Sequence, residues 1–150
     1  MGAYSFKDVV ASISGAGGSI NIGSDAGVAS EGITIEPVND KNVMTIGADG
    51  QGMHSLSADK SCTVTIRLLK TSPTNAQLQA MYNTQTASAR LHGKNSMTIR
   101  DISRGDTNAL EGVAFKRQPS ISYTKDGEIM VWMFDAISSA PILGVGTPAK

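Results

Sequence analysis

The residue types that most often carry catalysis or bind metals are sparse in this chain. It contains two histidines, His54 and His92, and a single cysteine, Cys62. Protein zinc sites pair such ligands at short, regular spacings, and neither histidine has a partner at such a spacing. His54 follows a glycine-rich segment and His92 follows an expected helix, so surface or capping roles are favoured. Cys62 lies in a strand-like run, where a lone cysteine is usually a small buried apolar residue.

The acidic residues and the glycine-rich segments do not complete a catalytic motif either. The carboxylates are scattered along the chain, among them Asp8, Glu36, Asp49, Asp101, Asp106, Glu111 and Asp135. No spacing between them identifies an acid–base pair. Residues 15–18 (GAGG) lack the Lys-Ser/Thr ending of a phosphate loop, and residues 49–52 (DGQG) fall short of a calcium loop. We therefore expect a protein that is not an enzyme and that uses no metal or cofactor.

Composition favours one β-rich domain that does not grip nucleic acid. The chain has 150 residues, enough to bury one core, with 16 glycines and 5% aromatic residues. Its 13 basic and 13 acidic residues balance, whereas nonspecific DNA affinity needs an excess of lysine and arginine. DNA that passes without being held remains compatible with this balance. Neither a signal peptide nor an apolar run of membrane-spanning length is recognisable, so we expect no membrane anchor.

One strand-like segment, residues 128–135, is apolar on both of its faces. In an extended chain one face would carry Ile129, Val131 and Met133, and the other Met130, Trp132 and Phe134. A strand in a small antiparallel sheet normally shows one polar face to water. An amphipathic helix could cover one face, and a neighbouring subunit could cover the other. The segment therefore points to a protein that assembles.

The rest of the chain reads as short strands and one helix. Ser72 and Pro73 are suited to a helix start, and Leu78, Met81, Tyr82 and Gln85 form a narrow stripe, which predicts a helix over about residues 73–90, with Gly93 as a stop. We expect strands at 6–13, 19–22, 32–36, 43–46, 53–57, 61–69, 96–102, 108–117, 120–124 and 128–137. The last two should pair as a hairpin. No linker divides the chain, so residues 1–150 should form one domain.

Several runs resemble, in order, a family of structural proteins from contractile-tailed bacteriophages, the tail tube proteins. The resemblance is carried by residues 31–36, 40–50, 52–56, 65–76 and 114–119. It implies an Hcp-like, mainly β fold, a small β-barrel or two packed antiparallel sheets with one flanking helix. It also implies hexameric rings that stack into a tube inside a contractile sheath and conduct genome DNA into the host. The implied partners are further copies of the chain, the sheath, baseplate, tail-terminator and tape-measure proteins, with DNA as transient cargo. The implied location is the virion, after assembly in the host bacterial cytoplasm.

Within that picture, strand alternation and loop character suggest which residues meet the channel and the neighbouring subunits. Polar positions on two alternating strands predict a channel wall formed by Thr34, Glu36, Thr63 and Thr65. A long polar loop region, about residues 39–57, is expected to make inter-subunit and ring-stacking contacts. Its candidate residues are Asp40, Lys41, Asn42, Asp49, Gln51, Met53 and His54. Residues 1–4 and 138–150 are expected to be terminal arms.

Two other functional interpretations remain open on the sequence. An inner-tube protein of a related contractile injection system, such as type VI secretion or a bacteriocin particle, would share the fold and differ in cargo. A β-sandwich binding module would need a cluster of exposed aromatic residues, and the chain offers only Trp132 and three tyrosines as polar-tipped aromatics. Trp132 lies in the doubly apolar segment, where a core position is favoured.

Overall fold

The computed structural model describes residues 9–22, 28–38, 42–102, 105–127 and 129–144. In chain order the elements are β1 (Val9–Gly15), β2 (Gly18–Asn21), β3 (Val28–Pro37), β4 (Asn42–Ile46), β5 (Gly52–Leu56), β6 (Cys62–Leu69), α1 (Thr74–Thr86), β7 (Asn95–Asp101), β8 (Asp106–Arg117) and β9 (Ile129–Ile142). The mainly β class with a single helix, expected from the sequence, is therefore confirmed for the described part of the chain.

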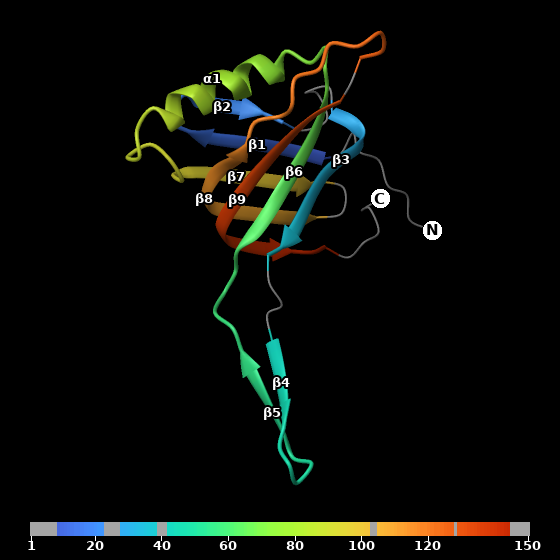
Figure 1. Cartoon of the computed structure of the whole chain (residues 1–150), viewed down its shortest axis with the longest axis vertical. Coiled ribbons are helices and arrows are strands. Elements are labelled where there is room, and N and C mark those ends of the chain that lie inside the picture. Colours follow the sequence, from blue (N-terminus) through green and yellow to red (C-terminus); the bar gives the residue numbers. More distant parts are fainter. Residues whose placement is uncertain (1–8, 23–27, 39–41, 103–104, 128, 145–150) are drawn as a thin grey trace.

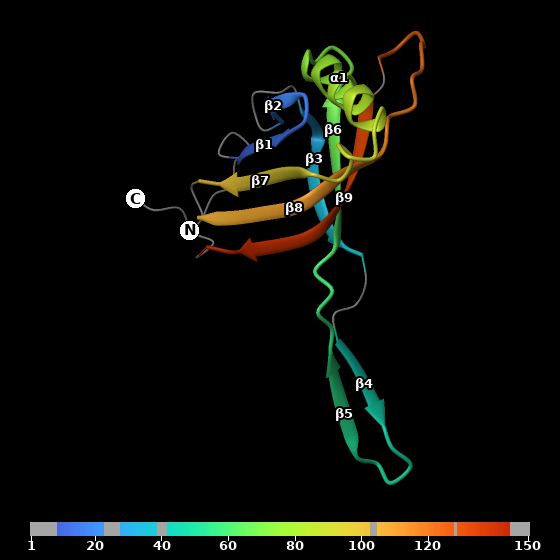
Figure 2. The ribbon, with the colours of Figure 1, turned by 90° about the vertical axis from the view of Figure 1, so that its left-hand side faces the viewer.

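Seven strands form one antiparallel sheet, and two form a separate hairpin. The large sheet has the order β2-β1-β7-β8-β9-β6-β3, and the small one pairs β4 with β5. Figures 1 and 2 show that the large sheet is strongly bent, so that β3 and β6 run across the direction of β1, β7 and β8. The bend passes through β8 and β9, where Gly112 has a positive φ of 62° and the register shifts near Arg117. β2 and β3 remain edge strands, so the sheet does not close into a barrel.

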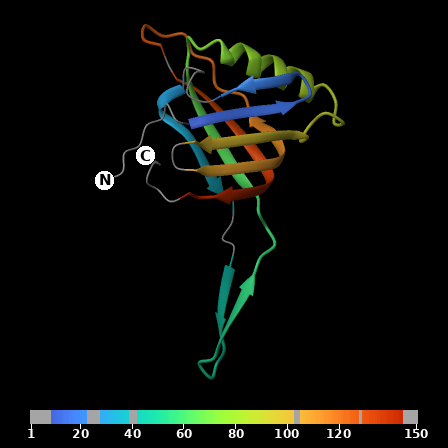
Figure 3. The same ribbon diagram turned by 180° about the vertical axis from the view of Figure 1, so that it is seen from behind.

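The core fills the concave side of this bent sheet. On β6, Cys62, Val64, Ile66 and Leu68 are buried, as their alternation predicts, and Cys62 is free. Phe115 packs edge-on against Trp132 with ring centroids 5.9 Å apart, and against Phe134 at 4.7 Å. Helix α1 adds Leu78 and Met81 to this core. Figure 3 shows the helix lying along one end of the sheet, next to β2.

A buried pair of amides fixes the helix to the sheet. Gln85 on α1 and Asn95 on β7 exchange two hydrogen bonds of 2.6 and 2.7 Å, and both side chains are almost fully buried. Gln85 also donates to the carbonyl of Ala16 in the β1–β2 turn, at 2.9 Å. A buried polar group is tolerated when its hydrogen bonds are made. The predicted stripe residue Gln85 is therefore a specific anchor for the helix.

Some predicted boundaries and pairings are wrong. Helix α1 ends at Thr86, before residue 90 and well before Gly93. The expected hairpin of 120–124 with 128–137 does not form, because β9 pairs with β6 and β8 instead. The segment 118–127 contains no strand. Its second residue, the buried Pro119, has no backbone N–H to donate to a neighbouring strand.

The terminal and loop regions also differ from expectation. Residues 138–142 belong to β9 and pair with β8, so the expected arm from residue 138 is wrong over that stretch. Within the expected loop region 39–57, residues 42–46 and 52–56 form two strands, and their large apolar side chains are exposed. Residues 1–4 and 145–150 lie outside the described residues.

Candidate assembly surfaces

The hairpin of β4 and β5 stands away from the rest of the molecule. Figures 1 and 2 show it extending beyond the end of the bent sheet, connected through the segments that follow β3 and precede β6. We call residues 42–56 the arm. Its strands pair in register from Asn42 opposite Leu56 to Ile46 opposite Gly52. The strand at 43–46 and its pairing with 53–57, both expected from the sequence, are confirmed.

The arm presents apolar side chains to solvent on both faces. Cross-strand partners share a face, so Met44, Ile46 and Leu56 lie on one side and Val43 and Met53 on the other. All five are between 56% and 86% exposed. The body buries its apolar strand residues, whereas the arm buries none of these. An exposed apolar surface of this kind usually marks an interaction site.

The tip of the arm is held by its own hydrogen bonds. The Gln51 N–H donates to Asp49 Oδ1 at 3.1 Å, and the Gly47 N–H donates to the Gln51 carbonyl at 2.7 Å. Gly50 has a positive φ of 87°, which a residue with a side chain rarely adopts. One carboxylate oxygen of Asp49 therefore holds the turn together. The backbone of the turn, fixed by these bonds, sets the orientation of the other oxygen.

The predicted ring-stacking residues fall on this arm wherever the structure describes them. Asn42, Asp49, Gln51, Met53 and His54 all lie on it, with Met44 opposite His54 and Thr45 opposite Met53. Asp40 and Lys41 lie outside the described residues. The sequence interpretation missed Val43, Met44, Ile46 and Leu56, because the region was treated as a polar loop. The available signal was the apolar content of the runs VMTI and MHSL.

The four predicted channel-wall residues lie together on the convex face of the sheet. Thr34 is opposite Thr65, and Glu36 is opposite Thr63, so they form two adjacent cross-strand pairs of β3 and β6. Arg67 lies on the same face and donates to Thr34 Oγ1 at 3.2 Å, while Thr63 donates to Asp135 at 3.3 Å. The structure brings these residues together on one polar surface.

The doubly apolar segment turns one face inward and leaves the other partly open. Trp132 and Phe134 are fully buried, and Trp132 Nε1 donates to Asn75 Oδ1 on helix α1 at 3.0 Å. On the opposite face Ile129 and Val131 are 40% and 37% exposed. A shallow pocket of about 280 Å³ covers this exposed face, lined by Arg117, Pro119, Ser120, Ile129, Val131 and Met133. We call these six residues the β9 pocket.

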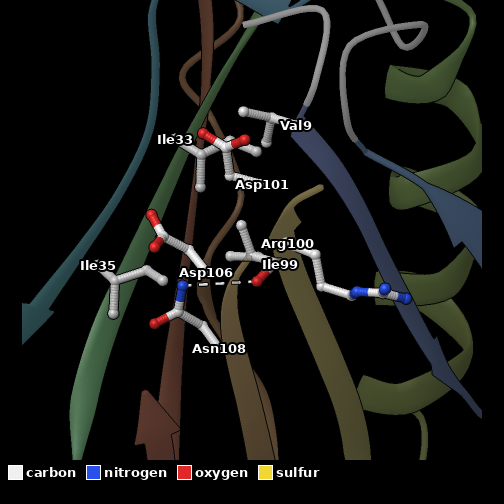
Figure 4. Close-up of a pocket in the computed structure, with 8 residues that line it drawn as sticks. All are labelled: Val9, Ile33, Ile35, Ile99, Arg100, Asp101, Asp106 and Asn108. Atoms are coloured by element: carbon white, nitrogen blue, oxygen red, sulfur yellow. Dashed lines mark hydrogen bonds between the residues drawn. The ribbon is translucent and has the colours of Figure 1, made fainter. Parts of the chain in front are cut away.

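A second hollow lies at the open side of the bent sheet, between β3 and β7. Figure 4 shows Ile33 and Ile35 on one wall and Ile99 on the other, with Asp101 and Asp106 between them. The two carboxylates are direct cross-strand partners, and Asp106 accepts a hydrogen bond of 2.7 Å from the Gly144 N–H. Asn108 Nδ2 donates to the Ile99 carbonyl at 3.4 Å. Asp106 and Asn108 thus bond to nearby backbone groups, which fits a structural role.

The described residues form no metal-binding cluster, membrane-spanning helix or exposed aromatic cluster. Among them, no three His, Cys, Asp or Glu side chains gather closely enough to hold a metal ion. No described helix has the length and apolar character needed to cross a bilayer. Of the aromatic residues described, Tyr123 alone is highly exposed, at 87%, while Trp132, Phe115 and Phe134 are buried. An exposed aromatic cluster, which a carbohydrate-binding module would need, is therefore not formed by this part of the chain.

Solved structures with a similar fold come from contractile injection systems. A chain in the anti-feeding prophage cap (AFP tube terminating cap) aligns with a TM-score of 0.55 and 10% identity, covering 96% of this chain and 93% of that one. A chain of the anti-feeding prophage baseplate gives 0.55 and 8%, with coverages of 95% and 96%. A chain of the PVC sheath/tube terminator, from an extracellular contractile injection system, gives 0.50 and 14%, with coverages of 97% and 99%. At these identities the likeness establishes the fold alone.

Sequence comparison identifies the family. No curated protein matches the chain significantly. The family model described as bacteriophage PhiTE tail tube protein matches residues 1–144, which is nearly the whole chain. The exposed arm and the partly covered β9 strand agree with a protein that builds a larger structure. The chain therefore belongs to the bacteriophage PhiTE tail tube protein family, and its role is that of a structural tail tube protein.

Proposed function

We propose that this chain forms hexameric rings that stack into the hollow tube of a contractile phage tail, through which genome DNA enters the host. The observation that carries the proposal is the family match over residues 1–144. The protein acts by assembly and catalyses no reaction, and it uses no cofactor. Its place is the virion, after assembly in the cytoplasm of the host bacterium.

The arm supports stacking. A two-stranded hairpin without a hydrophobic support is at best marginally stable in water. In this chain the arm exposes Val43, Met44, Ile46, Met53 and Leu56. Each subunit has one arm, and an arm that binds a different surface on the next copy makes a heterologous contact. Heterologous contacts that do not close into a ring build open helical assemblies. Such a contact suits stacked rings, and it gives the candidate residues Asn42, Asp49, Gln51, Met53 and His54 a common location.

The polar pairs of β3 and β6 support a channel wall that does not retain DNA. Thr34, Glu36, Thr63 and Thr65 present hydroxyls and a carboxylate on one face. Strong binding of DNA comes from cations that neutralise phosphates, and Arg67, which neighbours these four residues, donates to Thr34. The formal net charge of the chain is zero. A wall of this composition would let DNA pass as transient cargo without specific binding.

The partners follow from the same proposal. The tube would lie inside a sheath, begin at a baseplate, end at a tail terminator and be set in length by a tape-measure protein. The fold likeness to chains from a tube-terminating cap and a baseplate supports contacts of this class. Among the described strands, β2 and β3 lie at the two edges of the sheet, and contacts of these edges within a ring would protect them from uncontrolled pairing.

The test is to purify the protein and image it by negative-stain electron microscopy, followed by symmetry analysis of end-on views. Hollow rings with six-fold symmetry, or tubes built from them, are the expected result. Rings of another symmetry would overturn the hexamer. Monomers that persist at high concentration, in the presence of the cognate tape-measure and baseplate proteins, would overturn the tube assignment.

The second candidate is the inner tube of another contractile injection system. It is favoured by one observation, the fold likeness to anti-feeding prophage chains with TM-scores of 0.55. The two candidates share rings and stacking and differ in cargo. Particles that contain DNA in the tube lumen support the phage tail, whereas DNA-free particles that deliver protein support the second candidate.

A further inference from the structure

The bend of the large sheet lies where β9 changes its partner. Residues 129–136 of β9 pair with β6, whereas residues 138–142 have β8 as their ladder partner. One half of the sheet therefore carries β6 and β3, and the other half carries β7, β1 and β2. Figure 2 shows that the strands of the two halves run in different directions. Since β2 and β3 are the edges of the sheet and lie in different halves, the bend sets the angle between the two edges.

A bulge with a glycine lies at this point of β8. Two residues of β8, Glu111 and Gly112, are opposite one residue of β7, Ser96, because the register of the two strands shifts there. An extra residue in one strand bends that strand and increases its twist, and a glycine at such a bulge has positive φ. Gly112 has a φ of 62°. The bulge therefore bends β8 at the place where β9 passes from one half of the sheet to the other.

The backbone and the surroundings of position 112 are suited to glycine alone. Residues with a side chain rarely adopt positive φ. A Cβ at position 112 would also lie 3.0 Å from both Cβ and Cδ1 of Ile137, closer than an ordinary contact. β8 has a second irregularity, between Phe115 and Arg117, but every positive φ among the described residues belongs to a glycine. The second irregularity can thus accept many residues, whereas the bend at Gly112 depends on its residue type.

We propose that Gly112 sets the size of the ring by fixing the angle between the β2 and β3 edges. This inference rests on the proposed function, in which these edges make contacts within a ring. A β2 edge that meets the β3 edge of the next copy makes a heterologous contact, and such contacts form a ring only if the rotation closes. A six-fold ring needs a rotation of one sixth of a turn at each copy. Gly112 is therefore a positioning residue, which acts on the contacts through the bend of the sheet.

The first test measures the bend in the monomer. Spin labels on Ser19→Cys of β2 and Glu36→Cys of β3, both exposed positions, report the distance between the edges by double electron–electron resonance. Native Cys62 is buried and is not expected to take up a label. Gly112→Ala should shift this distance, because the backbone at 112 must leave positive φ or β9 must move away from the new Cβ.

Gly105→Ala is the matched control for backbone strain. Gly105 lies directly before β8 and has a positive φ of 81°. A Cβ there would come no closer than 3.9 Å to its nearest neighbour, the Cα of Gly144. The control variant therefore has the same kind of strain outside the bend, and it should leave the distance between the edges unchanged.

The second test measures ring symmetry by electron microscopy across a series at position 112. Asparagine tolerates positive φ, alanine adopts it rarely, and the β-branched valine hardly at all. Six-fold rings should persist in Gly112→Asn and should give way to open rings or rings of other sizes in Gly112→Ala and, further, in Gly112→Val. A relaxed alanine variant must recover the strained backbone to enter a six-fold ring, so the concentration needed should rise about tenfold. The rise for Gly112→Asn should be less than about threefold.

A double variant tests the contact with Ile137. Gly112→Asn combined with Ile137→Gly removes the side chain that the new Cβ would meet, so six-fold rings should form at the wild-type concentration. Circular dichroism shows which variants are folded, and if Gly112→Val unfolds, the asparagine and alanine variants decide.

The outcomes separate the role of Gly112 from the proposed function. Six-fold rings of Gly112→Ala at the wild-type concentration overturn the role of Gly112 and leave the tube role intact. A distance between the edges that Gly112→Ala leaves unchanged, or that Gly105→Ala shifts equally, does the same. Wild-type protein that forms neither rings nor tubes with its partners overturns both.

Discussion

The bent sheet and the arm use the same strand chemistry for opposite purposes. On β6, alternate residues such as Val64 and Ile66 are buried against the core. On β4 and β5, apolar residues such as Met44 and Met53 are exposed on both faces. The sheet satisfies its hydrophobic surface within one chain, whereas the arm leaves its own to be satisfied elsewhere. The bent sheet therefore lets the monomer fold, whereas the arm drives the association of copies.

The largest effect that should separate the two regions comes from removing the first strand and the turn of the arm. We expect deletion of residues 40–50 to leave a folded monomer, because no core residue is lost, and to abolish stacking completely. Circular dichroism and denaturation would check the fold, and electron microscopy would check assembly. Tubes of normal length from the deletion variant would contradict the arm's role. Loss of the fold would contradict the independence of the two regions.

The opposite change targets the core of the sheet. Trp132→Ala would leave a large cavity and an unpaired Asn75 oxygen, so we expect a loss of about 3–5 kcal/mol in the free energy of unfolding. Urea denaturation followed by circular dichroism measures it. Trp132→Phe is the matched control, since it keeps most of the apolar volume and loses the Nε1 hydrogen bond to Asn75. A loss equally large for both variants would show that the hydrogen bond, and not the packing, dominates.

The anchor between helix and sheet should give the next smaller effect. Gln85→Ala removes both hydrogen bonds to Asn95, leaving buried polar atoms without those partners, and should cost about 2–3 kcal/mol. The measurement is again the free energy of unfolding. Gln77→Ala, at an exposed position of the same helix, is the control and should change it by less than about 0.5 kcal/mol. Since alanine favours a helix at least as well as glutamine, equal losses would show that the buried amide pair is not what makes Gln85 important.

The sequence predicted the elements more reliably than their partners. Alternation located β6, and the glycine turn at 15–18 located the β1–β2 hairpin, because these signals are local. The pairing of β9 with β6 and β8 joins residues far apart in sequence, and no local pattern specifies it. For the same reason, the segment 120–124 was wrongly assigned to a hairpin with the strand that follows it. The apolar residues on both faces of β9 predicted that both faces are covered. Trp132 and Phe134 lie on the inner face, which is covered by the core.

The candidate site was predicted in position but not in character. The strand runs at 43–46 and 53–56 are short and are separated by a glycine-rich segment, so the region was described as a polar loop. Sequence alone does not tell whether such a strand reaches the core, and in the structure the apolar Met44 and Leu56 are strongly exposed. Thr34, Glu36, Thr63 and Thr65 were chosen individually and are found as two cross-strand pairs. Their place on a channel wall stays a prediction.

The smallest effect on folding, with a clear effect on assembly, should come from a single arm residue. Leu56 is 86% exposed, so Leu56→Ser should change the free energy of unfolding by less than about 0.5 kcal/mol. If a neighbour buries that side chain, its loss weakens each contact by about 1.5–3 kcal/mol, which raises the concentration needed for assembly by tenfold or more. Sedimentation of tubes across a concentration series measures this. Leu68→Ser, on the buried side of β6, is the control and should destabilise the monomer itself. Unchanged assembly of Leu56→Ser would restrict the contact to the tip of the arm.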